Sequence, residues 1–280
     1  MPAAAVPRPV VDPRTGLRAD GGPEPDRLAL LGTLQEAFAA AVLATDPGAP
    51  VPACGDWTAR ELVVHLAGVH HWAAGMAAGD DTRAEDLPVP DGGPEALADL
   101  YGRHAAELRA VLAAVGPAAR ASTLVGDGPV GDGPASFWRR RQVHETLVHL
   151  HDLHAARLGS GPAVVTGDAL PVAPEVWADC VDEIVTMFQP RQVRLGRMAP
   201  LPEPVRLVAA DLGWSWTLGA HDGGSPDDEA GRRRPAATLS APAHGLALLL
   251  WGRLDPAGAG ATVDGDDAVV RRALGAPVVP

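Results

Sequence analysis

Four long segments with helical apolar spacing are the feature that most restricts how this chain can fold. In each of them apolar residues recur at intervals of three or four, which is typical of amphipathic helices. The segments cover residues 26–44, 58–79, 94–115 and 136–158. Thr58 with Glu61 has the form of a capping box at the start of the second segment, and Gly159 follows the fourth. Because long amphipathic helices bury their apolar faces against one another, the sequence predicts a four-helix bundle over residues 25–166.

The pattern changes after residue 167. Helical spacing and short alternating segments follow one another, and the latter are typical of strands. We expect helices at 174–188, 244–251 and 267–273, and strands at 205–209, 215–218 and 237–240. This mixture predicts a separate α+β domain with an antiparallel sheet over residues 167–280. Residues 1–24 are rich in Pro and Gly without periodicity, so we expect a flexible tail there.

The charge balance argues against several classes of partner. The chain has 23 basic and 35 acidic residues, a net charge of −12, and no dense stripe of arginines with interleaved aromatic residues. Nucleic acid and anionic membranes are therefore poor partners. The sequence has neither a signal-peptide pattern nor an apolar run of the ~20 residues that span a membrane, so we expect a cytoplasmic protein. The two cysteines, Cys54 and Cys180, are expected to be reduced thiols without a catalytic role.

The fourth helical segment concentrates residues that can bind a metal. His144, Glu145 and His149 invite comparison with the HExxH motif of zinc proteases. Five residues turn a helix by about 500°, however, so His144 and His149 lie roughly 140° apart and cannot both face one ion. Glu145 and His149 are four residues apart, and Asp152 follows three later. These three side chains form one stripe, which can face the interior of the bundle.

Two ligands on one helix require a third from a facing helix. His65 is the best candidate because it lies among the apolar residues Leu62, Leu66 and Val69 of the second segment. The sequence therefore predicts a divalent-metal site formed by His65, Glu145 and His149. The alternative is a hydrogen-bonded core histidine beside an ordinary helical Glu–His pair. His144 could orient a ligand from behind it, and the following histidines are interpreted as polar-face or packing residues: His70, His71, His104, His151 and His154.

These residues resemble the mycothiol-dependent maleylpyruvate isomerase family. The matching positions are Trp57-Thr58, residues 62–66, Arg141, His144-Glu145, Val148-His149 and Asp152, followed by residues 245–253 and 263–266. The resemblance implies a DinB-like metal-binding bundle followed by a small α+β domain similar to sterol-carrier-like folds. It also implies that His65, Glu145 and His149 bind zinc or another divalent metal, with an open position for water or a thiolate.

The resemblance further implies mycothiol as a thiol cosubstrate. A metal-activated thiolate would add to an electrophilic unsaturated small molecule, and bond rotation with elimination would give an isomer, whereas an S-transferase would keep the adduct. Arg253 is a candidate to bind a substrate carboxylate, although it could equally complete a helix C-terminus. Asp152 could support a ligand, act as a general base or contact the thiol.

Two other functions stay open at this level. The chain could be a metallohydrolase that uses zinc-bound water without a thiol. It could also be a non-catalytic module whose C-terminal domain holds an apolar compound while the bundle is structural. We expect a monomer or a weak homodimer in each case.

Overall fold

The computed structural model describes residues 8–19, 21, 25–80, 87–159, 170, 172–219 and 234–280. The chain divides into two compact units, Val11–Pro171 and Val172–Pro280, the second of which also includes Met1–Val10. The expected domain boundary at residues 166 and 167 lies outside the described residues, as do residues 1–7, 20 and 22–24 of the expected tail. None of the described helices combines the length and the apolar character needed to cross a bilayer.

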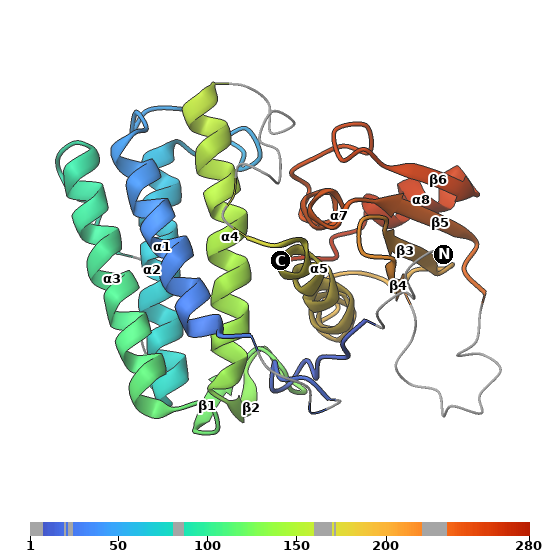
Figure 1. Ribbon diagram of the computed structural model, residues 1–280, viewed down its shortest axis with the longest axis horizontal. Helices are drawn as coiled ribbons and strands as arrows, with labels where there is room; N and C mark the ends of the chain where they lie inside the picture. Colours follow the sequence, from blue (N-terminus) through green and yellow to red (C-terminus); the bar gives the residue numbers. More distant parts are fainter. Residues whose placement is uncertain are drawn as a thin grey trace, which may run out of the picture. The chain divides into compact units, whose positions relative to one another are not determined.

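Four helices form the first unit (Figure 1). They are α1 (Arg27–Leu43), α2 (Ala59–Ala78), α3 (Pro94–Val115) and α4 (Ser136–Leu158). Figure 1 shows them side by side, with α2 packed along α3 and α1 packed against both α3 and α4. The expected helical N-terminal domain is confirmed.

The ends of α2 and α4 follow the predicted capping signals. The backbone N–H of Thr58 donates to Oε2 of Glu61 at 2.8 Å, which is one arm of the capping box. Gly79 ends α2 with a φ of 79°, and Gly159 ends α4 with a φ of 60°, a conformation that favours glycine. Local sequence signals therefore set both ends of α2 and the C-terminal end of α4. These ends determine where each side chain lies along its helix axis.

A short hairpin that the sequence did not predict leads into α4. Strands β1 (Arg120–Thr123) and β2 (Gly131–Pro134) pair antiparallel. Neither has the alternating apolar pattern that indicates a strand, since β2 reads Gly-Asp-Gly-Pro. The indole N–H of Trp138, in the first turn of α4, donates to the carbonyl of Ser122 at 2.7 Å. The hairpin thus anchors the N-terminal end of α4.

Residues 8–19 differ from the expected flexible tail. Val11 is buried and forms an antiparallel bridge with Arg18, and the hydroxyl of Ser136 donates to the carbonyl of Thr15. This segment is ordered because its backbone groups find partners at the start of α4, which composition alone does not reveal.

The second unit is an α+β domain. Its helices are α5 (Pro174–Glu183), the π-helix η3 (Ile184–Phe188), α6 (Gln189–Arg194), α7 (Ala243–Leu250) and α8 (Asp267–Leu274). Its strands are β3 (Val205–Ala209), β4 (Trp214–Leu218), β5 (Ala237–Ala241) and β6 (Thr262–Gly265), in the order β4-β3-β5-β6. Helices α7 and α8 both contact β3 and β5, the two central strands. The α+β class is therefore confirmed.

The sheet is mixed, whereas the sequence predicted an antiparallel one. Strands β3 and β4 pair antiparallel, and so do β5 and β6, but the central strands β3 and β5 run parallel. The two outer pairings are antiparallel as predicted, and the central pairing of β3 with β5 differs. Strand β6 was not predicted, because its four residues are all exposed and show no alternation.

A buried carboxylate stabilises the second unit. Oδ1 of Asp182, on α5, accepts a hydrogen bond from the indole N–H of Trp216 at 2.9 Å and forms an ion pair with Arg8. An Asp182→Ala variant is expected to lose about 3 kcal/mol of unfolding free energy, because it leaves both donors without this acceptor. Chemical denaturation followed by circular dichroism measures the loss. Glu175→Ala, at an exposed position of the same helix, is the matched control, and equal losses in both variants would contradict the prediction.

Candidate metal centre

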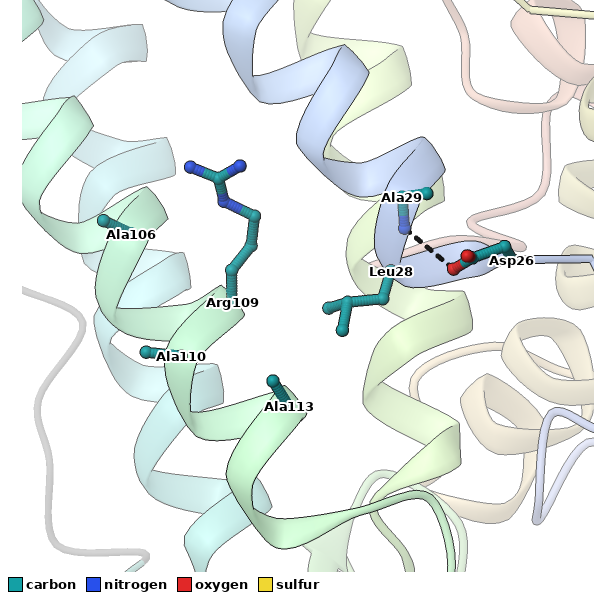
Figure 2. A pocket seen from close by; sticks show the side chains of 7 residues that line it. All are labelled: Asp26, Leu28, Ala29, Ala106, Arg109, Ala110 and Ala113. Atoms are coloured by element: carbon teal, nitrogen blue, oxygen red, sulfur yellow. Dashed lines mark hydrogen bonds between the residues drawn. The ribbon is translucent and has the colours of Figure 1, made fainter.

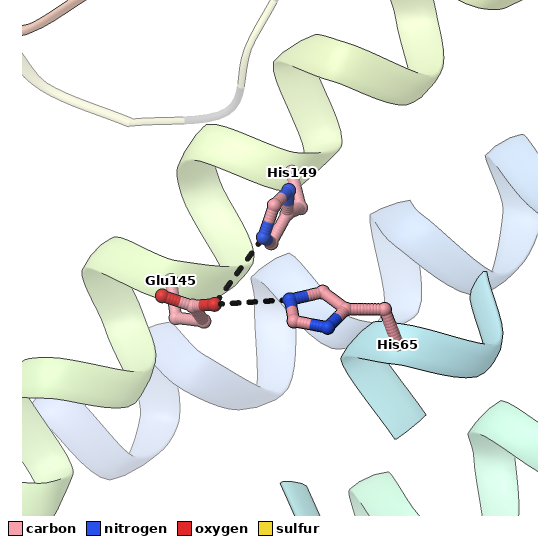
Figure 3. A group of neighbouring side chains, drawn as sticks. All are labelled: His65, Glu145 and His149. Atoms are coloured by element: carbon pink, nitrogen blue, oxygen red, sulfur yellow. Dashed lines mark ion pairs between the residues drawn. The ribbon is translucent and has the colours of Figure 1, made fainter. Parts of the chain in front are cut away.

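Three side chains from two helices converge in the first unit. His65 is on α2, and Glu145 and His149 are on α4, one turn apart. Figure 3 shows them pointing toward one another. Oε1 of Glu145 lies 3.2 Å from Nε2 of His149 and 3.8 Å from Nε2 of His65, and the candidate ligand atoms all lie within 4.8 Å of one another. The structure thus brings together the three residues that the sequence predicted as ligands.

Arg141 directs the Glu145 carboxylate. It lies one turn earlier on α4 and forms an ion pair with Oε2, so that Oε1 is the oxygen that faces the two imidazoles. Burial raises the pKa of Glu145, but Arg141, His149 and His65 more than offset this effect, and the net result is a pKa below the ordinary value. Glu145 is therefore held as a carboxylate, the form that binds metals.

Asp152 orients the His149 ring from the other side. Its Oδ2 lies 3.0 Å from Nδ1 of His149, so the Nδ1–H donates to the carboxylate and Nε2 is directed toward Glu145. Burial lowers the pKa of His149, but the hydrogen bonds to Asp152 and Glu145 raise it to about 9. The carboxylates of Asp152 and Glu145, on either side of the His149 ring, therefore favour the protonated, positively charged imidazole.

His65 forms the more open side of the cluster. Its side chain is 31% exposed, compared with 9% for His149, and its ring lies 4.9 Å from that of Trp57 and 5.2 Å from that of His149. Solvent therefore reaches the cluster at His65.

One neighbour of the site was not expected. Cys54, in the loop before α2, places its Sγ 3.6 Å from Oδ2 of Asp152. Cys54 and Asp152 are 98 positions apart in the sequence, and no local pattern predicts their contact. The conformation of the loop brings the thiol to this place. His144, by contrast, is buried and is not one of the three converging residues, as its five-residue spacing from His149 predicts.

The donor set suits a divalent cation. Two imidazole nitrogens and one carboxylate oxygen are the protein ligands of many catalytic zinc sites, which keep a further position open. When an ion takes the place of the proton on Nε2 of His149 and both imidazoles are neutral, the carboxylates of Glu145 and Asp152 outweigh Arg141 by one negative charge, so a cation is electrostatically favoured. The residues present therefore fit a metal ion of this kind.

A separate surface groove lacks such chemistry. It lies between the start of α1 and α3 and is lined by Leu28, Arg109 and several alanines (Figure 2). Asp26, at its edge, accepts a hydrogen bond from the backbone N–H of Ala29 at 2.9 Å and so serves as the N-cap of α1. None of the predicted site residues lines this groove.

Arg253, the other candidate from the sequence, belongs to the second unit. Its guanidinium donates to the carbonyl of Trp251 at 2.8 Å, where α7 ends. This is the helix-terminal contact that the alternative interpretation expected.

Another buried histidine in the bundle provides a pH-dependent prediction. Nδ1 of His70, on α2, donates to Oε1 of Gln142 at 2.8 Å, and burial lowers its pKa to about 4. The unfolded chain takes up a proton near pH 6.5 while the native state stays neutral, so stability falls as the pH drops from 6.5 toward 4, by about 3 kcal/mol in total. Urea unfolding at several pH values should show a loss that is about 3 kcal/mol larger in the wild type than in His70→Gln, which lacks the titrating imidazole. Parallel pH profiles in the two proteins would contradict the prediction.

Comparison with known proteins supplies independent information. Residues 28–154 match the family model for the mycothiol maleylpyruvate isomerase N-terminal domain, and residues 175–272 match the model for its C-terminal domain. A crystal structure of the mycothiol-dependent maleylpyruvate isomerase is similar, with a TM-score of 0.59 and 15% identity over 86% of this chain and 93% of that chain. A histidine-to-alanine mutant of that isomerase gives a TM-score of 0.55 and 14% identity over 80% and 87% of the two chains. At such identities the likeness shows a shared fold, and no curated protein matches the sequence directly.

Proposed function

Because the chain belongs to the mycothiol-dependent maleylpyruvate isomerase family, we propose that it is a thiol-dependent isomerase or S-transferase with a zinc site at His65, Glu145 and His149. The observation that carries the proposal is the approach of both Nε2 atoms to one carboxylate oxygen, at 3.2 and 3.8 Å. Bound zinc would supply Lewis acidity, which lowers the pKa of a thiol and makes the thiolate available near neutral pH.

The residues around the ligands have distinct tasks in this proposal. Arg141 holds the outer oxygen of Glu145, so that the carboxylate presents Oε1 to the centre. Asp152 keeps the proton of His149 on Nδ1 and thereby leaves Nε2 to bind. The partly exposed His65 leaves a side by which the thiol and the substrate enter.

The proposed reaction needs no other reagent for isomerisation. The thiolate forms a C–S bond to one carbon of an unsaturated substrate, and the double-bond electrons move onto a conjugated carbonyl. The former double bond is then single and rotates. When the electrons return, the double bond forms again, the C–S bond breaks and the thiolate leaves unchanged. In S-transfer the resulting enolate instead takes a proton from water on carbon, and the adduct is the product.

The decisive experiment combines maleylpyruvate, mycothiol and the zinc-loaded protein. Conversion that requires the thiol and disappears in His65→Ala supports the proposal, and the ratio of isomer to adduct separates isomerase from S-transferase. Water-dependent cleavage of the substrate without thiol would instead favour a metallohydrolase. Tight binding of apolar compounds with no turnover would favour a binding module.

Arg253 stays a prediction for substrate binding. If its guanidinium pairs with a substrate carboxylate, Arg253→Ala should raise KM roughly tenfold, the effect of losing about 1.4 kcal/mol of binding. Arg253→Lys should recover part of this loss, and neither change should alter the metal content. Steady-state kinetics measure the effect, and an unchanged KM in Arg253→Ala would contradict the prediction.

A further inference from the structure

A second group of potential metal ligands lies elsewhere in the bundle. His71 is on α2, and His104 and Glu107 are on α3. Oε2 of Glu107 lies 2.9 Å from Nδ1 of His71 and 3.1 Å from Nδ1 of His104, and the candidate ligand atoms lie within 4.8 Å of one another. The two rings are 5.0 Å apart at an interplanar angle of 68°. One carboxylate oxygen thus has an imidazole nitrogen on each side.

This group is distinct from the site on α2 and α4. His71 follows His65 by six residues, so the two side chains lie about 120° apart round the helix and roughly 9 Å apart along its axis. Its partners come from α3, on the other side of α2 from the α4 ligands. The two groups therefore cannot share an ion.

Position and exposure suit a bound cation. His104 and Glu107 are three residues apart and share one face of α3, which packs along α2. The side chains are 28%, 18% and 30% exposed, so an ion can enter without a large desolvation cost and can keep water in its remaining positions. With their protons on Nε2, both imidazoles would direct Nδ1 lone pairs at an ion that Glu107 neutralises in part.

We propose that His71, His104 and Glu107 bind a second divalent ion of the zinc, nickel or copper class, which links α2 to α3. Imidazole nitrogen with carboxylate oxygen is a donor set that these ions prefer, and calcium or magnesium would need more oxygen ligands. The ion cross-links two helices through ligands that are distant in the sequence, with 36 positions between His71 and Glu107. It therefore stabilises the native bundle relative to the unfolded chain. The inference does not depend on the proposed enzymatic function.

Metal stoichiometry tests this proposal. The metal-free full-length protein is titrated with Zn²⁺ by calorimetry, and the wild type should bind two equivalents. His104→Ala and Glu107→Gln should each bind one, His65→Ala should bind the other one, and His65→Ala with His104→Ala should bind none. His154→Ala, which removes a partly exposed histidine of α4, is the matched control and should bind two.

A second measurement guards against loss of folding in the variants. In the His65→Ala background, Zn²⁺ should raise the Tm, and adding His104→Ala should abolish this rise while circular dichroism stays native. Thiol-dependent turnover should persist in His104→Ala, which separates this site from the catalytic proposal. No Zn²⁺ binding in the His65→Ala background, or binding in that background that survives both His104→Ala and Glu107→Gln, would overturn the inference.

Discussion

Replacing His65 by alanine is expected to weaken zinc binding at the α2/α4 site at least 100-fold and to abolish thiol-dependent turnover, while the bundle stays folded. The reason is that one of three protein ligands is lost, and each ligand contributes a few kcal/mol to a zinc site. The side chain is 31% exposed, so its removal opens no internal cavity. Competition with a chromophoric chelator measures the affinity, and circular dichroism checks the fold.

Two further variants make this result specific. Glu145→Ala should also lose the ion, but it leaves the nearly buried Arg141 without its carboxylate and should destabilise the protein as well. His144→Ala removes the imidazole next to Glu145 in the sequence and should retain the metal, because His144 is not among the converging residues. Equal metal retention in all three variants would exclude the ligand assignment.

The helices could be predicted closely because their signals are local. The predicted bounds of α3 and α4 agree with the structure, and those of α2 follow from Thr58, Glu61 and Gly79. Strands β3 to β5 were found from short alternating patterns, with ends that differ by at most one residue. Strand β6 and the β1/β2 hairpin were missed because tertiary pairing, and not a local apolar pattern, stabilises them.

The long helix predicted at residues 174–188 shows the limit of such signals. The structure divides it into α5 and the π-helix η3, and helical structure continues through α6 to Arg194. Pro190 occupies one of the first two positions of α6, where its missing N–H is tolerated. Propensity alone cannot tell a proline that ends a helix from one that begins the next.

The candidate site also contains contacts that local spacing predicts and contacts that it does not predict. Helical periodicity selected Glu145, His149 and Asp152 as one stripe and excluded His144, and apolar neighbours selected His65. Periodicity says nothing about a loop, so it could not place Cys54 beside Asp152. It also gave no reason to pair His71 with Glu107, since that contact depends on how α2 packs along α3. The packing of the helices determines which helical faces are in contact, and helical spacing alone does not reveal this.

The Asp152→Asn variant decides among the three roles open to this carboxylate. An amide oxygen can still accept from Nδ1 of His149, but the negative charge that strengthens the ligand is lost. We therefore expect zinc affinity to fall 10- to 100-fold, less than in His65→Ala, with a near-normal kcat once the site is saturated with zinc. A general base would give the opposite pattern, with metal affinity unchanged and kcat greatly reduced. A contact to the thiol would raise only the KM for mycothiol. Because Asp152 is fully buried behind His149 and 3.0 Å from its ring, the structure favours the first pattern.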